Sequence, residues 1–217
     1  MLANLKQIAE LVDVFSRCGT RKTYKKGDFI IHPGEQPPGV FYIVQGLVKA
    51  YDISKYGEEN LLIIRKQDEI FPLIWALTGQ ERKVAYQTLA PTTVLEITRQ
   101  NFEEQIMQHT GAMAPLLDMT IEMYRLHSER ILNLEYRTVR ERIVSFMLTM
   151  VKRFGSRTPD GLLIEAPLRH QDIASSVNAT RETASREISA LVKKGYLGKQ
   201  KSLYLIKDIN GLRSLLR

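Results

Sequence analysis

The sequence predicts an α+β fold: an N-terminal antiparallel β-sandwich or roll, then a long helix, then a C-terminal winged helix-turn-helix. Three observations lead to this prediction. Short strand-like runs, separated by turn signals roughly every 7 to 12 residues, fill the first half of the chain. One unbroken helical pattern runs from Pro115 to about Leu134. Two further helical patterns, joined by a tight turn and followed by two short apolar runs, occupy residues 168–206.

The charge of the chain is unevenly distributed. Residues 1–136 carry 15 Lys+Arg and 17 Asp+Glu, a net of −2, whereas residues 137–217 carry 16 and 7, a net of +9. This asymmetry predicts a nucleic-acid face on the C-terminal part. The 217 residues are enough for one large domain or two modest ones.

The cysteine count and the hydropathy limit the location of the protein. Cys18 is the only cysteine, which excludes an intramolecular disulfide and a cysteine-rich iron-sulfur or zinc site. No apolar run approaches the roughly 20 residues that span a bilayer, and the N-terminus lacks a charged-then-apolar signal pattern. We therefore expect a cytoplasmic protein without a membrane partner.

The N-terminal half begins with a helical pattern and continues as strands. Residues 2–15 form an amphipathic helix that would cap the next domain, with apolar positions at Leu5, Ile8, Leu11, Val12 and Phe15. The following runs alternate or are rich in β-branched residues, and glycines and prolines lie between them. The predicted strands are Phe29–Ile31, Val40–Val44, Leu47–Ile53, Leu61–Ile64, Val84–Leu89 and Val94–Ile97.

The long helix, which follows a short one at residues 101–108, carries two apolar stripes. One seam consists of Leu117, Ile121, Tyr124 and Ile131, with Ser128 in the same register, and the other consists of Leu116, Met119, Met123 and Leu126. A helix that is apolar on two sides needs two partners. We expect one stripe to pack on its own β-domain and the first seam to pair with the same helix of a second subunit as a parallel coiled coil. The alternative is that one chain buries both stripes.

The C-terminal part begins with a capping box. Thr138 and Glu141 mark the start of a helix that ends at Gly155, and we expect residues 156–161, which contain Pro-Asp-Gly, to be an exposed loop. A helix over residues 168–177, a turn at Asn178-Ala179 and a helix from Thr180 then form the helix-turn-helix. The seam between these helices is predicted to contain Ile173, Ala174, Val177, Ala184, Ile188, Leu191 and Val192.

The rest of this part reads as a wing. Gly195 ends the second helix, basic residues lie between two short apolar runs, and Leu203–Ile206 forms the closing strand. Asp208 can cap a last short helix.

The second helix of this motif carries base-reading groups. Arg181 and Arg186 can each bond guanine O6 and N7, and Glu182 can accept from a cytosine amino group, while Ser185 lies between them. Arg181, Glu182 and Arg186 fall within one and a half turns, so they can share one face. A plain alternative is the charged surface helix of an ordinary bundle. Residues expected to grip phosphates and set the register are Thr180, Thr183, His170, Gln171, Arg169, Lys199 and Lys201.

The run from Arg169 to Leu197, with its Arg-Glu-Thr-x-x-Arg core at residues 181–186, resembles the DNA-binding domain of the CRP/FNR family, typified by the cyclic AMP receptor protein. The rest of the chain fits this family from end to end. The resemblance implies an N-terminal double-stranded β-roll, a jelly roll like that of cyclic-nucleotide-binding domains, with corners at Gly27, Gly34, Gly46 and Gly57. It also implies a homodimeric transcription regulator on palindromic double-stranded DNA.

On this reading, residues 1–110 form an effector-sensing β-roll domain, residues 111–136 a dimerisation helix and hinge, and residues 137–217 the DNA-binding domain. Arg181 resembles the branch that reads T-G-T-G-A, whereas Ser185 before Arg186 resembles the branch that reads T-T-G-A-T, so both half-sites stay open. In the family, the segment that matches residues 156–161 can touch RNA polymerase, which makes that enzyme a candidate partner.

The effector pocket departs from the family pattern. Pro72, followed by Leu73, stands where cyclic AMP-binding members carry a glutamate for the ribose, and Lys83 replaces the serine beside Arg82. We therefore do not expect control by cyclic AMP. An unknown anionic small molecule stays open as the effector, with Arg82 and Lys83 as candidate anchors and Trp75 and Tyr86 as candidate walls. The alternative is that Arg82 and Lys83 are solvated turn residues.

No metal or cofactor is expected. Cys18 alone cannot hold an iron-sulfur cluster, and His32, His109 and His127 lack a spacing that supports haem ligation.

Two other function classes fit the sequence less well. A nucleotide-sensing interaction module that regulates a partner without touching DNA would leave the basic helix-turn-helix unexplained. An enzyme has no support, because the chain contains no Walker loop, no HExxH motif and no nucleophile elbow.

Overall fold

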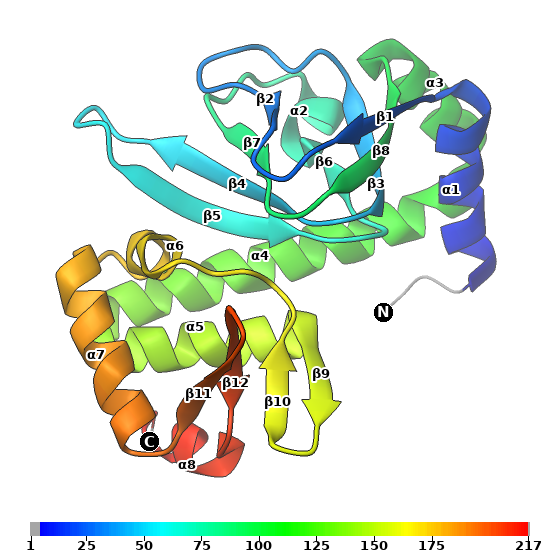
Figure 1. Ribbon diagram of the computed structural model, residues 1–217. Coiled ribbons are helices and arrows are strands. Elements are labelled where there is room, and N and C mark those ends of the chain that lie inside the picture. The colour runs from blue at the N-terminus through cyan, green and yellow to red at the C-terminus, as the bar shows by residue number, and fades with distance from the viewer. Residues whose placement is uncertain (1–4, 217) are drawn as a thin grey trace. The chain divides into compact units, whose positions relative to one another are not determined.

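The computed structural model describes residues 5–216 of the chain, and their side chains from Lys6 on. The contacts divide the chain into two compact units (Figure 1). The N-terminal unit comprises the chain up to Ile53 together with Leu62–Leu126, and the C-terminal unit comprises Ser54–Leu61 together with the chain from His127 on. Strand β5 (Glu59–Arg65) and helix α4 (Met113–Tyr136) therefore contribute to both units.

The N-terminal unit opens with α1 (Leu5–Cys18), the predicted amphipathic helix. Residues 2–4 of that prediction, and the side chain of Leu5, lie outside the described residues. Leu11 and Phe15 are buried in one apolar core with Tyr42 and Phe102, and the ring centroids of Phe15 and Tyr42 lie 5.5 Å apart. Helix α1 thus covers the β-structure, as the sequence predicted.

Two antiparallel four-stranded sheets form the body of the N-terminal unit, which confirms the predicted roll. Their strand orders are β1-β8-β3-β6 and β2-β7-β4-β5. At Gly46, between β3 and β4, φ is +110° and a Cβ would collide with Thr92, so only glycine fits this corner. The remaining strands are β1 (Thr20–Tyr24), β2 (Phe29–Ile31), β3 (Val40–Gln45), β4 (Val48–Ile53), β6 (Ile70–Phe71), β7 (Ala85–Thr88) and β8 (Thr92–Ile97).

Four elements of this unit were not predicted: β1, β6, the short helix α2 (Leu73–Thr78) and the 3₁₀ turn before α4. Pro72 is the N-cap residue of α2, and the Phe71–Pro72 peptide bond is cis. Helix α3 (Arg99–Gln108) begins two residues before its predicted start, because Thr98 Oγ1 accepts the Asn101 N–H and fixes the first turn there. A short 3₁₀ turn, Thr110–Ala112, leads into α4.

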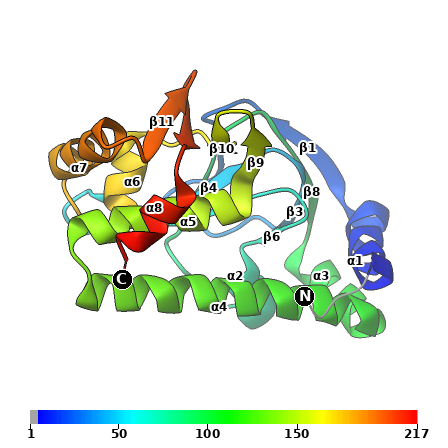
Figure 2. The same cartoon turned by 90° about the horizontal axis from the view of Figure 1, so that it is seen from below.

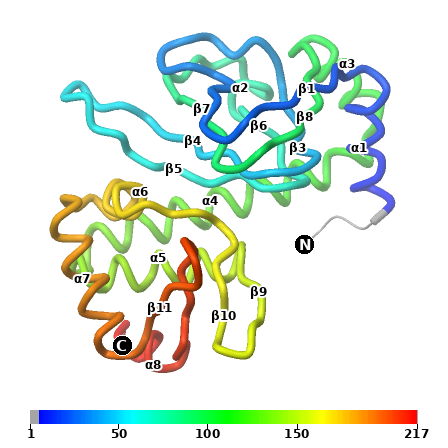
Figure 3. Tube along the Cα trace, viewed as in Figure 1, coloured from blue at the N-terminus to red at the C-terminus, as the bar shows by residue number. Residues whose placement is uncertain are grey.

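The C-terminal unit is a winged helix-turn-helix. Thr138 and Glu141 form the predicted capping box of α5, in which the Thr138 N–H donates to Glu141 at 2.8 Å. The antiparallel sheet has the order β11-β12-β10-β9 (Figure 3). The elements are α5 (Val139–Phe154), β9 (Gly155–Thr158), β10 (Gly161–Ile164), α6 (His170–Ser176), α7 (Arg181–Lys193), β11 (Leu197–Gln200), β12 (Leu203–Ile206) and α8 (Ile209–Ser214).

Two predictions for this unit were wrong. Residues 156–161 are not a plain loop: residues 156–158 belong to β9 and Gly161 begins β10, because the two strands pair as a hairpin and β10 pairs in turn with β12. Val192 does not fill the helix seam and is 42% exposed. It lies about 100° round the helix from Leu191, past the edge of the buried face. The other six predicted seam residues are buried.

None of the helices within residues 5–216 is both long and apolar enough to cross a membrane.

Candidate nucleic-acid interface

The entry into α7 is fixed by backbone bonds and by a cap. Asn178 adopts a left-handed φ of +50°, and the Ala179 N–H donates back to the Ala174 carbonyl at 3.0 Å, which closes the turn after α6. Thr180 Oγ1 then accepts the Thr183 N–H at 3.2 Å, so α7 begins at Arg181. The predicted phosphate contacts Thr180 and Thr183 thus bond each other within the cap, through hydroxyls 3.0 Å apart.

The exposed face of α7 carries the predicted base-reading groups. Ala184, Ile188 and Leu191 are buried, whereas Arg181, Glu182 and Arg186 are exposed and Ser185 is half-buried. At about 100° per residue, Glu182 and Arg186 lie opposite the buried stripe, and Arg181 and Ser185 lie on its flank. The structure therefore presents one arginine and one glutamate side by side and a second arginine at the helix start.

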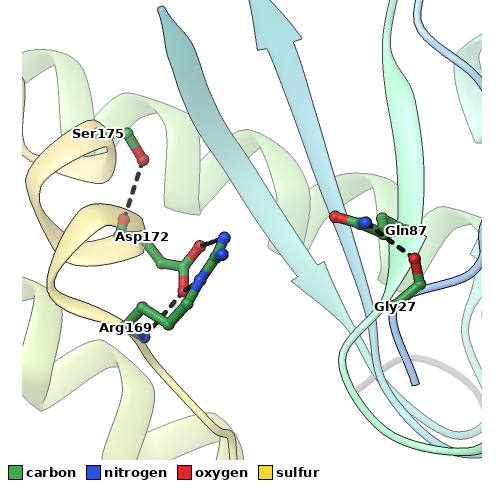
Figure 4. A network of polar contacts seen from close by, with 5 residues as sticks. All are labelled: Gly27, Gln87, Arg169, Asp172 and Ser175. Carbon is green, nitrogen blue, oxygen red and sulfur yellow. Dashed lines mark hydrogen bonds and ion pairs between the residues drawn. The ribbon is translucent and has the colours of Figure 1, made fainter.

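Helix α6 begins at His170, and Arg169, a predicted phosphate contact, is its N-cap residue. The Arg169 N–H donates to the buried Asp172 carboxylate at 2.8 Å, and the Arg169 guanidinium bonds the same carboxylate at 3.2 Å, while the Ser175 hydroxyl donates to the Asp172 carbonyl (Figure 4). The Arg169 side chain is still 66% exposed. Gln171 is exposed on the same turn.

His170 lies within electrostatic reach of cations from two other elements. Burial lowers the pKa of His170, and the charges of Lys199 on β11 and Arg181 on α7 lower it further. His170 therefore lies near two other residues predicted to contact DNA, and their positive charges disfavour its protonated form.

The wing presents its two lysines to solvent. Lys199 and Lys201 are exposed, and Lys201 has φ of +55° in the turn between β11 and β12. The ammonium of Lys199 lies 5.0 Å from the ring centroid of Tyr204, which is buried. Burial raises the pKa of Tyr204 to about 12, so the ring that Lys199 covers stays neutral at physiological pH.

Helix α5 supports α7 through an ion pair that the sequence analysis did not identify. Arg140 Nε donates to Glu187 Oε2 at 2.6 Å. Ser189 was also missed: it is exposed and follows Arg186 by three residues, so it lies on the same face. That spacing was the signal that could have identified it. Figure 2 shows α6 and α7 packed side by side, as their contacts require.

The two stripes of α4 differ in burial. Leu116 is buried in the core of the N-terminal unit and Met119 packs against it, whereas Leu117, Ile121 and Tyr124 are 51%, 47% and 75% exposed. Further along the same seam, Ile131 is 63% exposed and Ser128 is half-buried. Within the described chain, the stripe that contains Leu116 and Met119 has a packing partner, whereas the seam that contains Leu117 and Ile121 has none.

The candidate effector residues are divided between two buried cores and the exposed surface. Leu73 is buried in the same core as α1 and Trp75 packs against that core, whereas Tyr86 belongs to a second core, where its ring stacks on Phe71 at 4.8 Å. Arg82 and Lys83 are exposed.

Burial raises the pKa of Tyr86, and the charges of Arg65 and Arg82 oppose that rise. The buried Arg65 was not predicted. It donates to Glu69 and to the Met123 sulfur at 3.4 Å each, and its Nε has no partner among the described atoms. No group of three or more His, Cys, Asp or Glu side chains that could hold a metal ion occurs within residues 5–216.

Comparison with known proteins gives two family matches, one in each half of the chain. Residues 21–109 match the model of the cyclic nucleotide-binding domain, and residues 141–215 match that of the Crp-like helix-turn-helix domain. The chain is 28% identical over 203 residues to a global nitrogen regulator of Synechocystis sp., covering 87% of each protein. It is 29% identical over 178 residues to the cAMP-activated global transcriptional regulator CRP of Salmonella typhimurium, covering 81% of this chain and 83% of the relative.

Solved structures share the fold. A CooA mutant from Carboxydothermus hydrogenoformans superposes with a TM-score of 0.78 at 22% identity, covering 94% of this chain and 90% of that one. FixK2 from Bradyrhizobium japonicum superposes with a TM-score of 0.77 at 24% identity, covering 91% of this chain and 96% of that one. With the two domain matches in chain order and relatives aligned over most of their length, the protein belongs to the CRP/FNR family of transcription regulators, with a helix-turn-helix DNA-binding domain.

Proposed function

We propose that the protein is a homodimeric, sequence-specific regulator that works in the cytoplasm and reads a palindromic site with T-G-T-G-A-like or T-T-G-A-T-like half-sites. The observation that supports this most strongly is the solvent-exposed face of α7, on which Glu182 and Arg186 lie opposite the buried stripe. Arg181 at the helix start and Ser185 are the other base-reading residues. His170, Gln171, Arg169, Lys199 and Lys201 would hold phosphates around them.

Fluorescence anisotropy on palindromic duplexes of each half-site type tests base reading directly. Arg186→Ala should lose about 1 to 3 kcal/mol on the preferred duplex and relax the choice at one base pair. Lys201→Ala should weaken all duplexes alike and reduce the salt slope by about one. If Arg186→Ala weakened specific and random DNA equally, the base-reading role of Arg186 would be wrong.

The homodimer is supported by the exposed seam on α4, because a helix seldom leaves such large apolar side chains in water without a partner. Ile121→Glu should convert the dimer to a monomer in sedimentation velocity. Met107→Glu is the matched control, since Met107 is 81% exposed but lies on α3. A monomeric wild type, or an Ile121→Glu variant that stays dimeric, would contradict this assignment.

The effector is proposed to be an anionic small molecule other than cyclic AMP, held by Arg82 with Lys83 beside it. The charges of Arg65 and Arg82 near Tyr86, and an Arg65 Nε without a partner in the described part of the chain, support an anion site. Pro72 supports the exclusion of cyclic AMP, because it supplies neither a carboxylate nor an N–H. DNA binding that appears only when cyclic AMP is added would overturn this proposal.

RNA polymerase is the proposed protein partner at the β9–β10 turn, on the strength of the family resemblance. Asp160→Ala should then reduce transcription from a target promoter without changing DNA affinity, and equal losses of both would contradict it.

A further inference from the structure

Arg130 of α4 joins two segments of the C-terminal unit that are far apart in sequence. Its Nη1 donates to the Leu61 carbonyl at 2.9 Å, and its Nη2 donates to the Asn60 side-chain oxygen and to the Ser175 carbonyl at 3.3 Å. Asn60 and Leu61 belong to β5, and Ser175 lies in the last turn of α6. One guanidinium thus bonds a strand on one side and the first helix of the helix-turn-helix on the other.

The surroundings of Arg130 make this arrangement selective for arginine. Burial lowers the pKa of Arg130, and its three described acceptors are neutral oxygens, so no carboxylate among them offsets the cost of burying the charge. Burial of Arg130 is therefore offset by its charge-assisted hydrogen bonds. These bonds need a planar guanidinium, whose N–H donors point in two directions. A lysine ammonium offers a single point and cannot satisfy both sides equally well.

The Ser175 carbonyl lies at the C-terminal end of α6, directly before the turn that sets the position of α7. The last carbonyls of a helix have no intrahelical donor, and a cation near them is favourable. Two residues later the chain turns, through Val177 and the left-handed Asn178, into the N-cap of α7. A shift of the α6 C-terminus therefore moves the start of the recognition helix.

We propose that Arg130 is a positioning residue for DNA recognition, which fixes the α6–α7 turn to Asn60 and Leu61 of β5. This inference depends on α7 reading DNA as proposed above. It assigns a role in DNA affinity to Asn60, a strand residue 120 positions before the N-cap of α7.

The test is a double-mutant cycle on the full-length protein. DNA affinity for the preferred palindrome is measured by anisotropy at several salt concentrations for wild type, Arg130→Gln, Asn60→Ala and the double variant. Arg130→Gln should lose about tenfold in affinity, as expected for charge-assisted hydrogen bonds, with Arg130→Lys intermediate. Asn60→Ala should lose about threefold in the wild-type background and nothing further in Arg130→Gln, because the two groups act through one contact.

Two readouts separate positioning from other roles. If Arg130 touched a phosphate, Arg130→Gln would lower the slope of log affinity against log salt by about 0.9, whereas positioning leaves the slope unchanged. Arg125→Gln removes a guanidinium from the same helix, where Arg125 bonds Glu122, and should leave affinity within twofold of wild type.

Four results would overturn the inference: a reduced salt slope, an Arg130→Gln affinity within twofold of wild type, additive losses in the double variant, or an equal loss in Arg125→Gln. If Arg130→Gln fails to fold by circular dichroism, Asn60→Ala decides the matter, since a loss below twofold contradicts the proposed link. If the wild type itself showed no sequence preference, the proposed function would fail, which is a distinct outcome from wild-type specificity with an inert Arg130.

Discussion

The N-cap of α7 offers a perturbation that separates helix stability from DNA contact. Thr180→Ala removes the Oγ1 that accepts the Thr183 N–H at 3.2 Å. Loss of such a cap costs about 1 kcal/mol, and because RT is about 0.59 kcal/mol this corresponds to about fivefold more frequent opening of the first turn. Hydrogen exchange of the amides in residues 181–184, followed by mass spectrometry, measures this opening.

Thr180→Asp is the informative companion. An aspartate caps as well as threonine and its charge is favourable at a helix N-terminus, so exchange in the first turn should stay at or below the wild-type rate. The same charge faces the DNA phosphates in the proposed complex, so affinity should fall by about tenfold at low salt and recover partly as salt is raised. Exchange in Thr180→Ala within twofold of wild type, or Thr180→Asp exchanging as fast as Thr180→Ala, would refute the capping argument.

Three further predictions concern the C-terminal unit. Ile188→Ala empties a fully packed position and should cost about 2 to 5 kcal/mol in urea unfolding, against about 0.5 to 1.5 for Ile188→Val; equal costs would contradict the packing assigned to Ile188. A phosphate near His170 should raise its pKa from the lowered value of the free protein, so DNA binding takes up protons and affinity should fall as pH rises from about 5.5 to about 8, less steeply in His170→Gln; parallel pH profiles would exclude His170. Arg140→Glu and Glu187→Arg should each lower the midpoint of thermal unfolding, and the charge-swapped double variant should restore part of it; additive losses would show that the pair does not stabilise α7.

The elements predicted from sequence are those whose own side chains carry the pattern. Helix α7 was predicted because its buried residues recur at helical spacing and Thr180 marks its start. The β9–β10 hairpin was missed because it depends partly on a distant strand. β10 pairs with β12, more than 40 residues away, and no local sequence pattern predicts that pairing. Strand β1 reads Thr-Arg-Lys-Thr-Tyr and shows no apolar alternation. It pairs at the edge of a sheet, and its residues are mostly exposed.

In the candidate site too, residues with a local sequence pattern were predicted, and contacts between distant residues were not. Arg181, Glu182 and Arg186 were proposed from residue type and spacing; the structure puts Glu182 and Arg186 together opposite the buried stripe, but Arg181 on its flank. The supporting contacts could not be predicted, since Arg140 meets Glu187 only after folding and Arg130 bonds backbone carbonyls that every residue possesses. The effector residues were grouped by sequence proximity, whereas the fold places Leu73 and Tyr86 in different cores.

The unequal charge of the two halves of the sequence, −2 up to residue 136 and +9 after it, has a kinetic consequence. The field of a DNA duplex attracts the basic C-terminal part more strongly than the rest of the chain before any surfaces touch. A larger share of collisions should therefore begin at the helix-turn-helix. The association rate constant should therefore decline steeply with ionic strength, and neutralising basic residues distant from the bound DNA should slow encounter while leaving the lifetime of the complex almost unchanged.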